Sequence, residues 1–314
     1  MNFYYRTTFF FLLLIPGSYY GQDLEKYTYS HPQMGTEFRI ILYAENKENA
    51  DLFAQKAMDK IDKLNAIFSD YLPESELSRL SRTAGKNQKV RVSEDLWRVM
   101  KESKRFSRKS KGAFDITIGP LSKLWRSMFR QGRLFEKEKI SAAKTKVNYR
   151  NIKHFPLSKT IELTQAMMRL DLGGIAKGYT VDQVVQLLNQ AGYKQILVDG
   201  GGDIYAGDPP PNKKGWHIKI KKQTGSDHLL LKNKAIAVSG DTYRFLEWQD
   251  HRYSHIIDPR TGYGVTHKKI IHVLANDCTS ADALASTLSV LNETESKRFL
   301  KKWKKVEVLQ DVGN

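Results

Sequence analysis

The sequence predicts an α+β fold in which mixed strands and helices form a cleft. The 314 residues are 40% hydrophobic and 11% aromatic, enough to bury one large core or two smaller ones. Apolar residues repeat with a helical period in some segments and alternate in others. These segments follow one another without the regular rhythm of a doubly wound βαβ sheet, which favours α+β over α/β.

The first third of the chain supplies strands followed by helices. Residues 27–44 alternate between polar and apolar and predict strands around a bend at Met34-Gly35-Thr36. Apolar residues then keep a helical period over 50–68, which predicts a core-facing helix. Residues 74–82 predict a short helix after the break that ends at Pro73.

The middle of the chain is predominantly helical. Residues 93–109 predict a helix, and a further short helix is expected after Pro120. Residues 131–148 are polar and charged with no clear period, so we expect a surface excursion there. The amphipathic segment 178–191 predicts another core-facing helix.

The last third mixes strands with one strongly apolar helix. Residues 195–205 read as strand, turn and strand, with three consecutive glycines, 200–202, at the bend. In this turn we expect Asp199 and Asp203 to serve as scaffold. Further strands are expected near 216–221, 235–239 and 254–257, and the last helix over 282–291.

The N-terminus has the composition of a targeting segment. Arg6 precedes the apolar run Phe9–Ile15, which is followed by Pro16 and Gly17. The run is short for a membrane span, so we expect a secretory signal over residues 1–21 rather than an uncleaved anchor. No cysteine lies near it, so a lipid anchor is not expected. The sequence thus predicts an exported, periplasmic protein whose catalytic region covers residues 22–314.

Charge and cysteine usage narrow the classes of partner. There are 51 Lys and Arg residues against 34 Asp and Glu, a net charge of +17 that attracts anions. No nucleic-acid-binding motif accompanies this charge, so nucleic acid is not expected as a partner. Cys278 is the only cysteine, which excludes an intrachain disulfide and a cysteine-cluster metal site.

Two segments about a hundred residues apart have the composition of a phosphate and cation site. Residues 170–179 run through paired glycines into a predicted helix start, with Asp171 and Lys177 beside them. Residues 279–286 place Asp282 and Ser286 four positions apart on one helix face. A polyphosphate with a divalent cation would suit both together. The alternatives are a tight turn at the glycines and a carboxylate that only stabilises its own helix start.

Five segments in fixed order resemble one family. They are Met34-Gly35-Thr36, 113–117, 171–179, 255–259 and 279–286. Their order and residues are similar to those of the FAD:protein FMN transferase (ApbE) family, from about Met34 to Leu291. The resemblance implies a flavin-binding cleft and an enzyme that splits FAD, releases AMP and links FMN by a phosphoester to a threonine of a target flavoprotein.

The resemblance also implies site residues. The positions that match flavin-binding residues are Met34, Tyr71, Ala113, Phe114, Asp115, Asp171, Lys177 and Ile256. The positions that match magnesium ligands are Gly174, through its carbonyl, with Asp282 and Ser286. Ser286 departs from the family, which usually has threonine there, and the neighbouring Thr287 is an alternative ligand. Magnesium prefers such hard oxygen ligands, with phosphate and water completing its shell. Met34 and Phe114 also fit an ordinary core and turn role.

A threonine nucleophile needs a group that accepts its proton. His255 and Asp258 are the best placed by motif, and histidine is the commonest general base. Asp258-Pro259, followed by Thr261-Gly262, is equally a good turn sequence.

Two alternative functions keep the same flavin residues. An FAD pyrophosphatase would pass FMN to water and yield FMN and AMP, and a non-catalytic flavin-binding protein would release FAD intact. Only the transferase and the pyrophosphatase need magnesium and Asp282, and the binding protein does not. The expected partners are FAD and a target flavoprotein with an acceptor threonine. This flavoprotein could be membrane-associated. The sequence does not name that acceptor.

Overall fold

The computed structural model describes residues 24–222, 225–240 and 245–312. The predicted signal peptide over 1–21 lies outside these residues. Within them, no helix combines the length and the apolar character that a membrane crossing requires.

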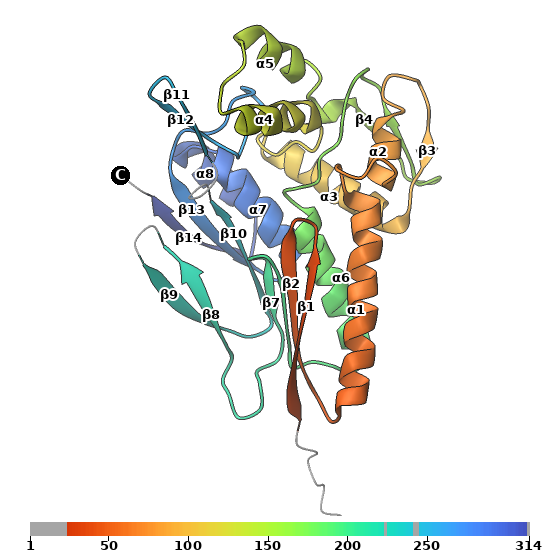
Figure 1. Cartoon of the computed structure of the whole chain (residues 1–314), viewed down its shortest axis with the longest axis vertical. Coiled ribbons are helices and arrows are strands. Elements are labelled where there is room, and N and C mark those ends of the chain that lie inside the picture. Colours follow the sequence, from red (N-terminus) through yellow and green to blue (C-terminus); the bar gives the residue numbers. More distant parts are fainter. Residues whose placement is uncertain (1–23, 223–224, 241–244, 313–314) are drawn as a thin grey trace, which may run out of the picture.

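A seven-stranded antiparallel sheet forms the centre of the molecule, in the order β1-β2-β6-β7-β10-β13-β14 (Figure 1). Side chains alternate between its two faces because successive residues of a strand point in opposite directions. In β2, for example, Phe38 and Ile40 pack in the main core, whereas Ile41 packs on the other face. The strands are β1 (Glu25–Gln33), β2 (Thr36–Ala44), β6 (Ile196–Gly200), β7 (Ile204–Ala206), β10 (Lys234–Gly240), β13 (Lys269–Ala275) and β14 (Glu307–Val312).

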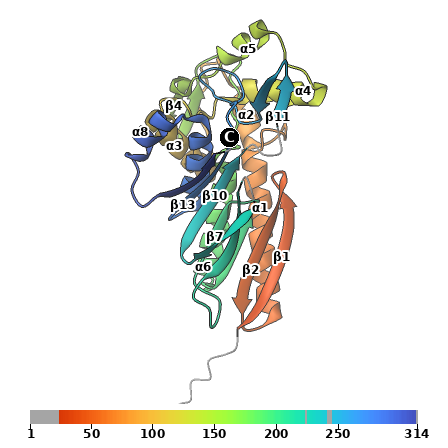
Figure 2. The same ribbon diagram turned by 90° about the vertical axis from the view of Figure 1, so that its left-hand side faces the viewer.

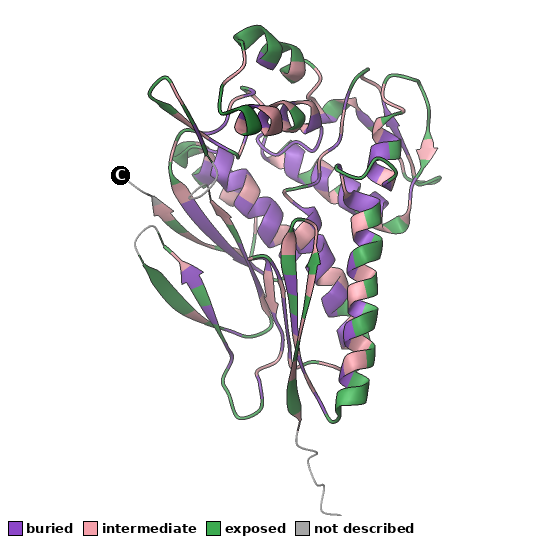
Figure 3. Ribbon diagram, viewed as in Figure 1, coloured by how far each residue is buried: buried purple, intermediate pink, exposed green. Residues whose placement is uncertain are grey.

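Three helices cover one face of the sheet and bury the main core: α1 (Lys47–Phe68), α6 (Ala176–Gln190) and α7 (Cys278–Val290). Figure 3 shows α7 buried along most of its length, whereas α1 has an exposed outer face. The other face is covered by the hairpin of β8 (Trp216–Lys221) and β9 (Ser226–Leu231), whose Trp216 and Ile218 pack in a second apolar cluster.

The remaining elements gather at one end of the sheet. Figures 1 and 2 both place α4, α5 and β11 there. The helices are α2 (Glu76–Ser81), α3 (Glu94–Lys109), α4 (Gly119–Gln131), α5 (Lys137–Lys144), the 3₁₀ turn η1 (Tyr149–Asn151) and α8 (Glu293–Leu300). The strands are β3 (Val90–Arg91), β4 (Ile152–Phe155) and β5 (Thr160–Leu163), which form one small sheet, and β11 (Phe245–Trp248) with β12 (His251–Ser254), which form another.

Most sequence predictions of elements are confirmed, and one is wrong. The bend at Met34-Gly35 joins β1 to β2, and α1, α3 and α6 occupy the predicted helical segments. Residues 131–148 lie mostly at the surface as predicted, but they contain α5, whose single buried residue, Ile140, is too little apolar signal to reveal a helix. The strand predicted for 254–257 is wrong, because β12 ends at Ser254 and Ile257 makes only an isolated bridge with Gly264.

Candidate active site

One cavity of about 830 Å³ lies where the sheet meets the upper elements, and we call it the flavin cavity. Nine parts of the chain line it: the β1–β2 turn, the end of α1 with the loop after it, the α3–α4 loop, α4, the start of α6, the β6–β7 turn, the end of β10, the β12–β13 loop and α7. Every residue that the sequence analysis assigned to the site lies in its lining except Asp258 and the alternative metal ligand Thr287, which is buried and donates its hydroxyl to the Ala283 carbonyl at 2.6 Å. These lining residues are Met34, Tyr71, Ala113, Phe114, Asp115, Asp171, Gly174, Lys177, His255, Ile256, Asp282 and Ser286.

The loop before α6 is pressed against α7, and glycines make this approach possible. A Cβ atom on Gly178 would lie 2.2 Å from the carbonyl oxygen of Cys278, and one on Gly174 would lie 2.9 Å from the Ser286 hydroxyl oxygen. Any larger residue would push the two segments apart. Gly174, Asp282 and Ser286 therefore meet at one corner of the cavity, which we call the glycine corner.

The glycine corner leaves an acceptor oxygen available. The backbone N–H of Gly178 donates to the Asp282 carboxylate at 3.1 Å, although the position four residues back in a regular helix would be the Gly174 carbonyl. No hydrogen bond in the described part of the chain ends on that carbonyl. A carbonyl, a carboxylate and a hydroxyl oxygen therefore converge, which is the hard donor set that magnesium prefers. No cluster of three or more His, Cys, Asp or Glu offers another metal site among the described residues.

Lys177 is anchored at the same corner by a buried carboxylate. Its ammonium forms an ion pair with Asp203, which is almost fully buried. Burial alone would lower the pKa of Lys177, but the neighbouring Asp203 and Asp282 outweigh it and raise that pKa, so the side chain stays charged. A fixed cation beside the glycine corner suits a bound phosphate.

Asp115 anchors the loop that carries Ala113 and Phe114. One of its oxygens accepts hydrogen bonds from the backbone and hydroxyl of Thr117, at 2.9 and 2.7 Å, and the other accepts from the backbone of Tyr149 at 2.8 Å. Burial raises the pKa of Asp115, and these donors oppose the rise. Because its oxygens already have protein partners, Asp115 shapes the cavity wall.

An arginine that the sequence analysis missed ties together three cavity residues. Arg126, from α4, forms ion pairs with Asp70 at 2.6 Å and Asp171 at 3.0 Å. Its guanidinium also lies 4.0 Å from the centre of the Tyr71 ring, a cation–π contact. Asp171 additionally accepts a hydrogen bond from the backbone of Gly173 at 2.8 Å, which fixes the entry to the glycine corner.

The β1–β2 turn brings Met34 to the cavity. Met34 has a left-handed backbone, with φ of 53°, and its sulfur lies 3.6 Å from the Thr180 hydroxyl oxygen on α6. A non-glycine residue in this region is uncommon, so tertiary contacts hold the turn in place.

The two candidate proton acceptors occupy different surroundings. His255 lines the cavity, next to Ile256. Asp258 lies outside the lining and accepts hydrogen bonds from the Arg260 side chain at 2.9 to 3.2 Å, and Arg260 also pairs with Glu295 on α8. The Asp258 carbonyl accepts from Gly262 at 2.8 Å, so this residue closes a turn. The geometry gives His255 access to a ligand and gives Asp258 a structural role.

Asp182 is a further residue that the sequence analysis missed. From α6 it accepts hydrogen bonds from the backbone N–H groups of Cys278 and Thr279, each at 2.8 Å, and so holds the start of α7. Burial raises its pKa to about 6, and its hydrogen bonds with Thr279 oppose the rise. Its position four residues after Gly178, on the same helix face, was an available signal. Arg126 gave no local signal, because its partners are distant in sequence, and the pairing of Asp203, expected as scaffold beside the glycine turn, with the distant Lys177 gave none either.

Comparison with known proteins shows the family to which the chain is similar. The model of the ApbE family matches residues 34–310. The chain is 31% identical to the FAD:protein FMN transferase of Haemophilus influenzae over 286 residues, covering 86% of this chain and 82% of that protein. It is 32% identical to the FAD:protein FMN transferase of Vibrio cholerae over 294 residues, covering 90% of this chain and 86% of that protein.

Solved structures show the same fold. The flavin transferase ApbE from Vibrio cholerae superposes with a TM-score of 0.81 at 27% identity, covering 93% of this chain and 95% of that one. The ApbE protein from Thermotoga maritima gives a TM-score of 0.81 at 27% identity, covering 91% of this chain and 94% of that one.

Proposed function

The chain belongs to the ApbE family and is an FAD:protein FMN transferase, and from this premise we propose how its cavity acts. The proposal is a magnesium-dependent transfer of FMN from FAD to a threonine hydroxyl of a target flavoprotein. The observation that carries it is the glycine corner, which joins the Gly174 carbonyl, Asp282 and Ser286 beside the charged Lys177 in one cavity.

The proposed reaction is a phosphoryl-type displacement. The threonine oxygen forms a bond to the phosphorus on the FMN side of the FAD pyrophosphate. The bond from that phosphorus to the bridging oxygen breaks, and AMP leaves with this oxygen. The threonine proton passes to a base, so the products are the phosphoester of FMN with the protein, AMP and a proton.

The residues of the corner would hold the phosphates in position. The Gly174 carbonyl, Asp282 and Ser286 would bind a magnesium ion, which when bound neutralises charge on the pyrophosphate. The Lys177 ammonium, held from behind by Asp203, would contact the same phosphates. Arg126 would keep Asp171 and the Tyr71 ring in place around the flavin.

His255 is the proposed base because it lines the cavity. Asp258, the other candidate from the sequence, is engaged with Arg260 and lies outside the lining. We therefore propose that His255 accepts the threonine proton and that Asp258 stabilises the turn.

We also propose that the enzyme acts outside the cytoplasm, in the periplasm, after removal of residues 1–21. The apolar run Phe9–Ile15 after Arg6 supports this. N-terminal sequencing of the mature protein should find a start close to Gln22. Retention of Met1 on a cytoplasmic protein would overturn the proposal.

The test of transfer follows the flavin and AMP together. Purified protein is incubated with FAD, magnesium and a periplasmic and membrane fraction of the source organism. A flavin-fluorescent band should survive denaturing electrophoresis, and mass spectrometry should find FMN less water on a threonine. AMP should appear in proportion, and removing magnesium with EDTA should stop both.

Two outcomes would favour the alternatives. AMP release at an equal rate without acceptor, with no protein gaining mass, would indicate an FAD pyrophosphatase. Binding of FAD with no AMP under any condition would indicate a non-catalytic flavin-binding protein.

A further inference from the structure

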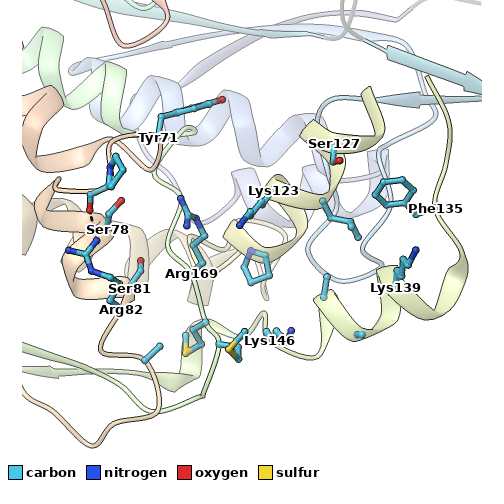
Figure 4. A pocket seen from close by; sticks show the side chains of 18 of the residues that line it. Tyr71, Ser78, Ser81, Arg82, Lys123, Ser127, Phe135, Lys139, Lys146 and Arg169 are labelled. Atoms are coloured by element: carbon cyan, nitrogen blue, oxygen red, sulfur yellow. Dashed lines mark hydrogen bonds between the residues drawn. The ribbon is translucent and has the colours of Figure 1, made fainter. Parts of the chain in front are cut away.

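A second cavity, of about 860 Å³, adjoins the flavin cavity. It lies between α2, the loop before α6 that contains Met167 to Arg169, and α4 with α5 (Figure 4). Its lining contains six cationic residues and no Asp or Glu. The cationic residues are Arg82, Lys86, Lys123, Lys139, Lys146 and Arg169, and we call this cavity the basic groove.

Much of this positive charge is uncompensated. Lys86, Lys123 and Lys146 form no ion pair with any residue that the structure describes. Arg169 donates to the backbone carbonyl of Asp70, and its buried Nε has no hydrogen-bond partner within the described ranges. Clustered cations of one sign attract an anionic ligand.

The groove also presents apolar side chains, one of which, Met167, has a strained backbone. Leu124 and Phe135 contribute to its lining, and Met167 is 70% exposed. Met167 has a left-handed backbone, with φ of 62°, which is costly for a residue with a Cβ atom. The neighbouring Ala166 is fixed by close contact with Gly85, where a Cβ atom would lie 2.6 Å from the Ala166 Cα. Strain of this kind, with an exposed apolar side chain, is typical of binding surfaces.

Tyr71 connects the two cavities, since it lines both. Tyr71 is 69% exposed, and its ring rests on the Arg126 guanidinium. A ligand that lies in the groove therefore ends at the mouth of the flavin cavity. The flavin cavity alone has a volume within the range of roughly 300–1,000 Å³ that small-molecule sites occupy, so FAD does not need the groove.

We propose that the basic groove docks an acidic segment of the acceptor flavoprotein, with apolar side chains among its carboxylates, and so leads the acceptor threonine past Tyr71. This inference rests on the proposed function, because it assigns the place where the transferase receives its protein substrate. Carboxylates match the unpaired lysines, and apolar side chains match Leu124, Phe135 and Met167.

The test uses two fluorescein-labelled peptides with one central threonine each. In the first, Asp and Glu alternate with Leu around the threonine, and in the second Asn and Gln replace the acids. Fluorescence anisotropy with the full chain should show binding of the acidic peptide and at least roughly tenfold weaker binding of the neutral one. Binding should weaken as salt is raised.

Charge reversal locates the binding site. Lys123→Glu combined with Lys146→Glu should weaken acidic-peptide binding roughly tenfold or more. The matched control combines Lys63→Glu on α1 with Lys301→Glu after α8, which makes the same change of charge on exposed residues outside both cavities. Equal losses in both variants, or no binding of the acidic peptide by the wild type, would overturn the proposal.

Two further readouts exclude other occupants. If the groove variant loses affinity for FAD as strongly as for the peptide, the groove belongs to the nucleotide site and the proposal fails. If vesicles containing phosphatidylglycerol bind in a groove-dependent way and the acidic peptide does not, the groove is a membrane contact and the proposal fails.

The inference and the proposed function fail separately. Acidic-peptide binding at the groove without transfer to any acceptor rejects the proposed function alone. Transfer to both peptides at equal rates, unchanged by the paired Lys123 and Lys146 reversals, rejects the groove alone.

Discussion

The glycine corner and the basic groove share one boundary residue, Tyr71, but they are built in opposite ways. The corner consists of buried or half-buried groups that contact one another, with Gly178 and Gly174 admitting α7 at distances that no Cβ atom would allow. The groove is lined by six cations, of which Lys86, Lys123 and Lys146 form no ion pair among the described residues, and by the exposed Met167 with its strained backbone. Packing therefore fixes the residues of the corner, whereas the groove residues would be brought into contact with one another only through a bound ligand.

The strongest test of this difference is Asp282→Ala in the corner. Loss of the carboxylate should reduce magnesium-dependent AMP release roughly 1000-fold, about 4 kcal/mol of transition-state stabilisation. The measurement is AMP released from FAD at saturating magnesium, with circular dichroism to verify the fold.

Asp59→Ala, on the exposed side of α1, is the matched control and should keep its activity. If Asp282→Ala turned over FAD like the wild type, Asp282 would not hold the metal.

The second test asks whether packing really fixes the corner. Gly178→Ala should cost about 3 kcal/mol of unfolding free energy, because its new methyl group would overlap the Cys278 carbonyl 2.2 Å away. Gly192→Ala, at φ of 94° with no atom within 4 Å, should cost only about 1 kcal/mol for its backbone strain. Urea denaturation measures both. Equal costs would mean that α6 and α7 separate easily.

The third test concerns pH, to which Asp182, the buried carboxylate that holds the start of α7, should respond. Asp182 has a pKa of about 6 against an ordinary 3.8, so its protonated form is favoured in the folded state. Its contribution to stability is therefore full below about pH 4 and is lost as the pH rises through about 6. Relative to the wild type, Asp182→Asn should gain about 2 kcal/mol between these limits, whatever its constant offset.

Unfolding of both proteins along a pH series measures this gain. His154, whose pKa burial lowers to about 4, titrates in both proteins and cancels in the difference. A difference that did not change with pH would show that Asp182 is ionised throughout.

The smallest expected effect concerns the groove, where a substitution by glycine should stabilise the folded protein. Met167→Gly removes the strain at φ of 62° and should stabilise the protein by about 0.5 kcal/mol, after the extra entropy of glycine in the unfolded chain. The same change should weaken binding of the acidic peptide. Thermal unfolding and anisotropy measure the two effects. A loss of stability would mean that Met167 packs as part of the fold.

The sequence predicted the corner better than its surroundings, for a physical reason. Gly174 stands in a segment marked by paired glycines before a helix, and Asp282 and Ser286 stand four positions apart on one helix, so each segment carries a local pattern although the contacts join the two segments. Arg126 meets Asp70 and Asp171 across 56 and 45 residues, and nothing near Arg126 in the sequence marks those partners.

Elements with little buried surface were the ones that could not be predicted from the sequence. α1 was clear because it buries an apolar residue on nearly every turn. α5 buries only Ile140, and its segment was predicted only as a surface excursion without a clear period. The lysines of the groove come from the α2–β3 loop, α4, α5 and the segment after α5, so no local pattern joins them.

The long sequence separation inside the glycine corner also sets when this site can exist. Gly178 and Asp282 are hydrogen-bonded across 104 residues, so the corner needs α7 as well as α6. Contacts between distant segments close late in folding. A growing chain on the ribosome therefore has no glycine corner until Ser286 has been made and has left the exit tunnel, and a ligand of this corner cannot assist the folding of the segments made before it.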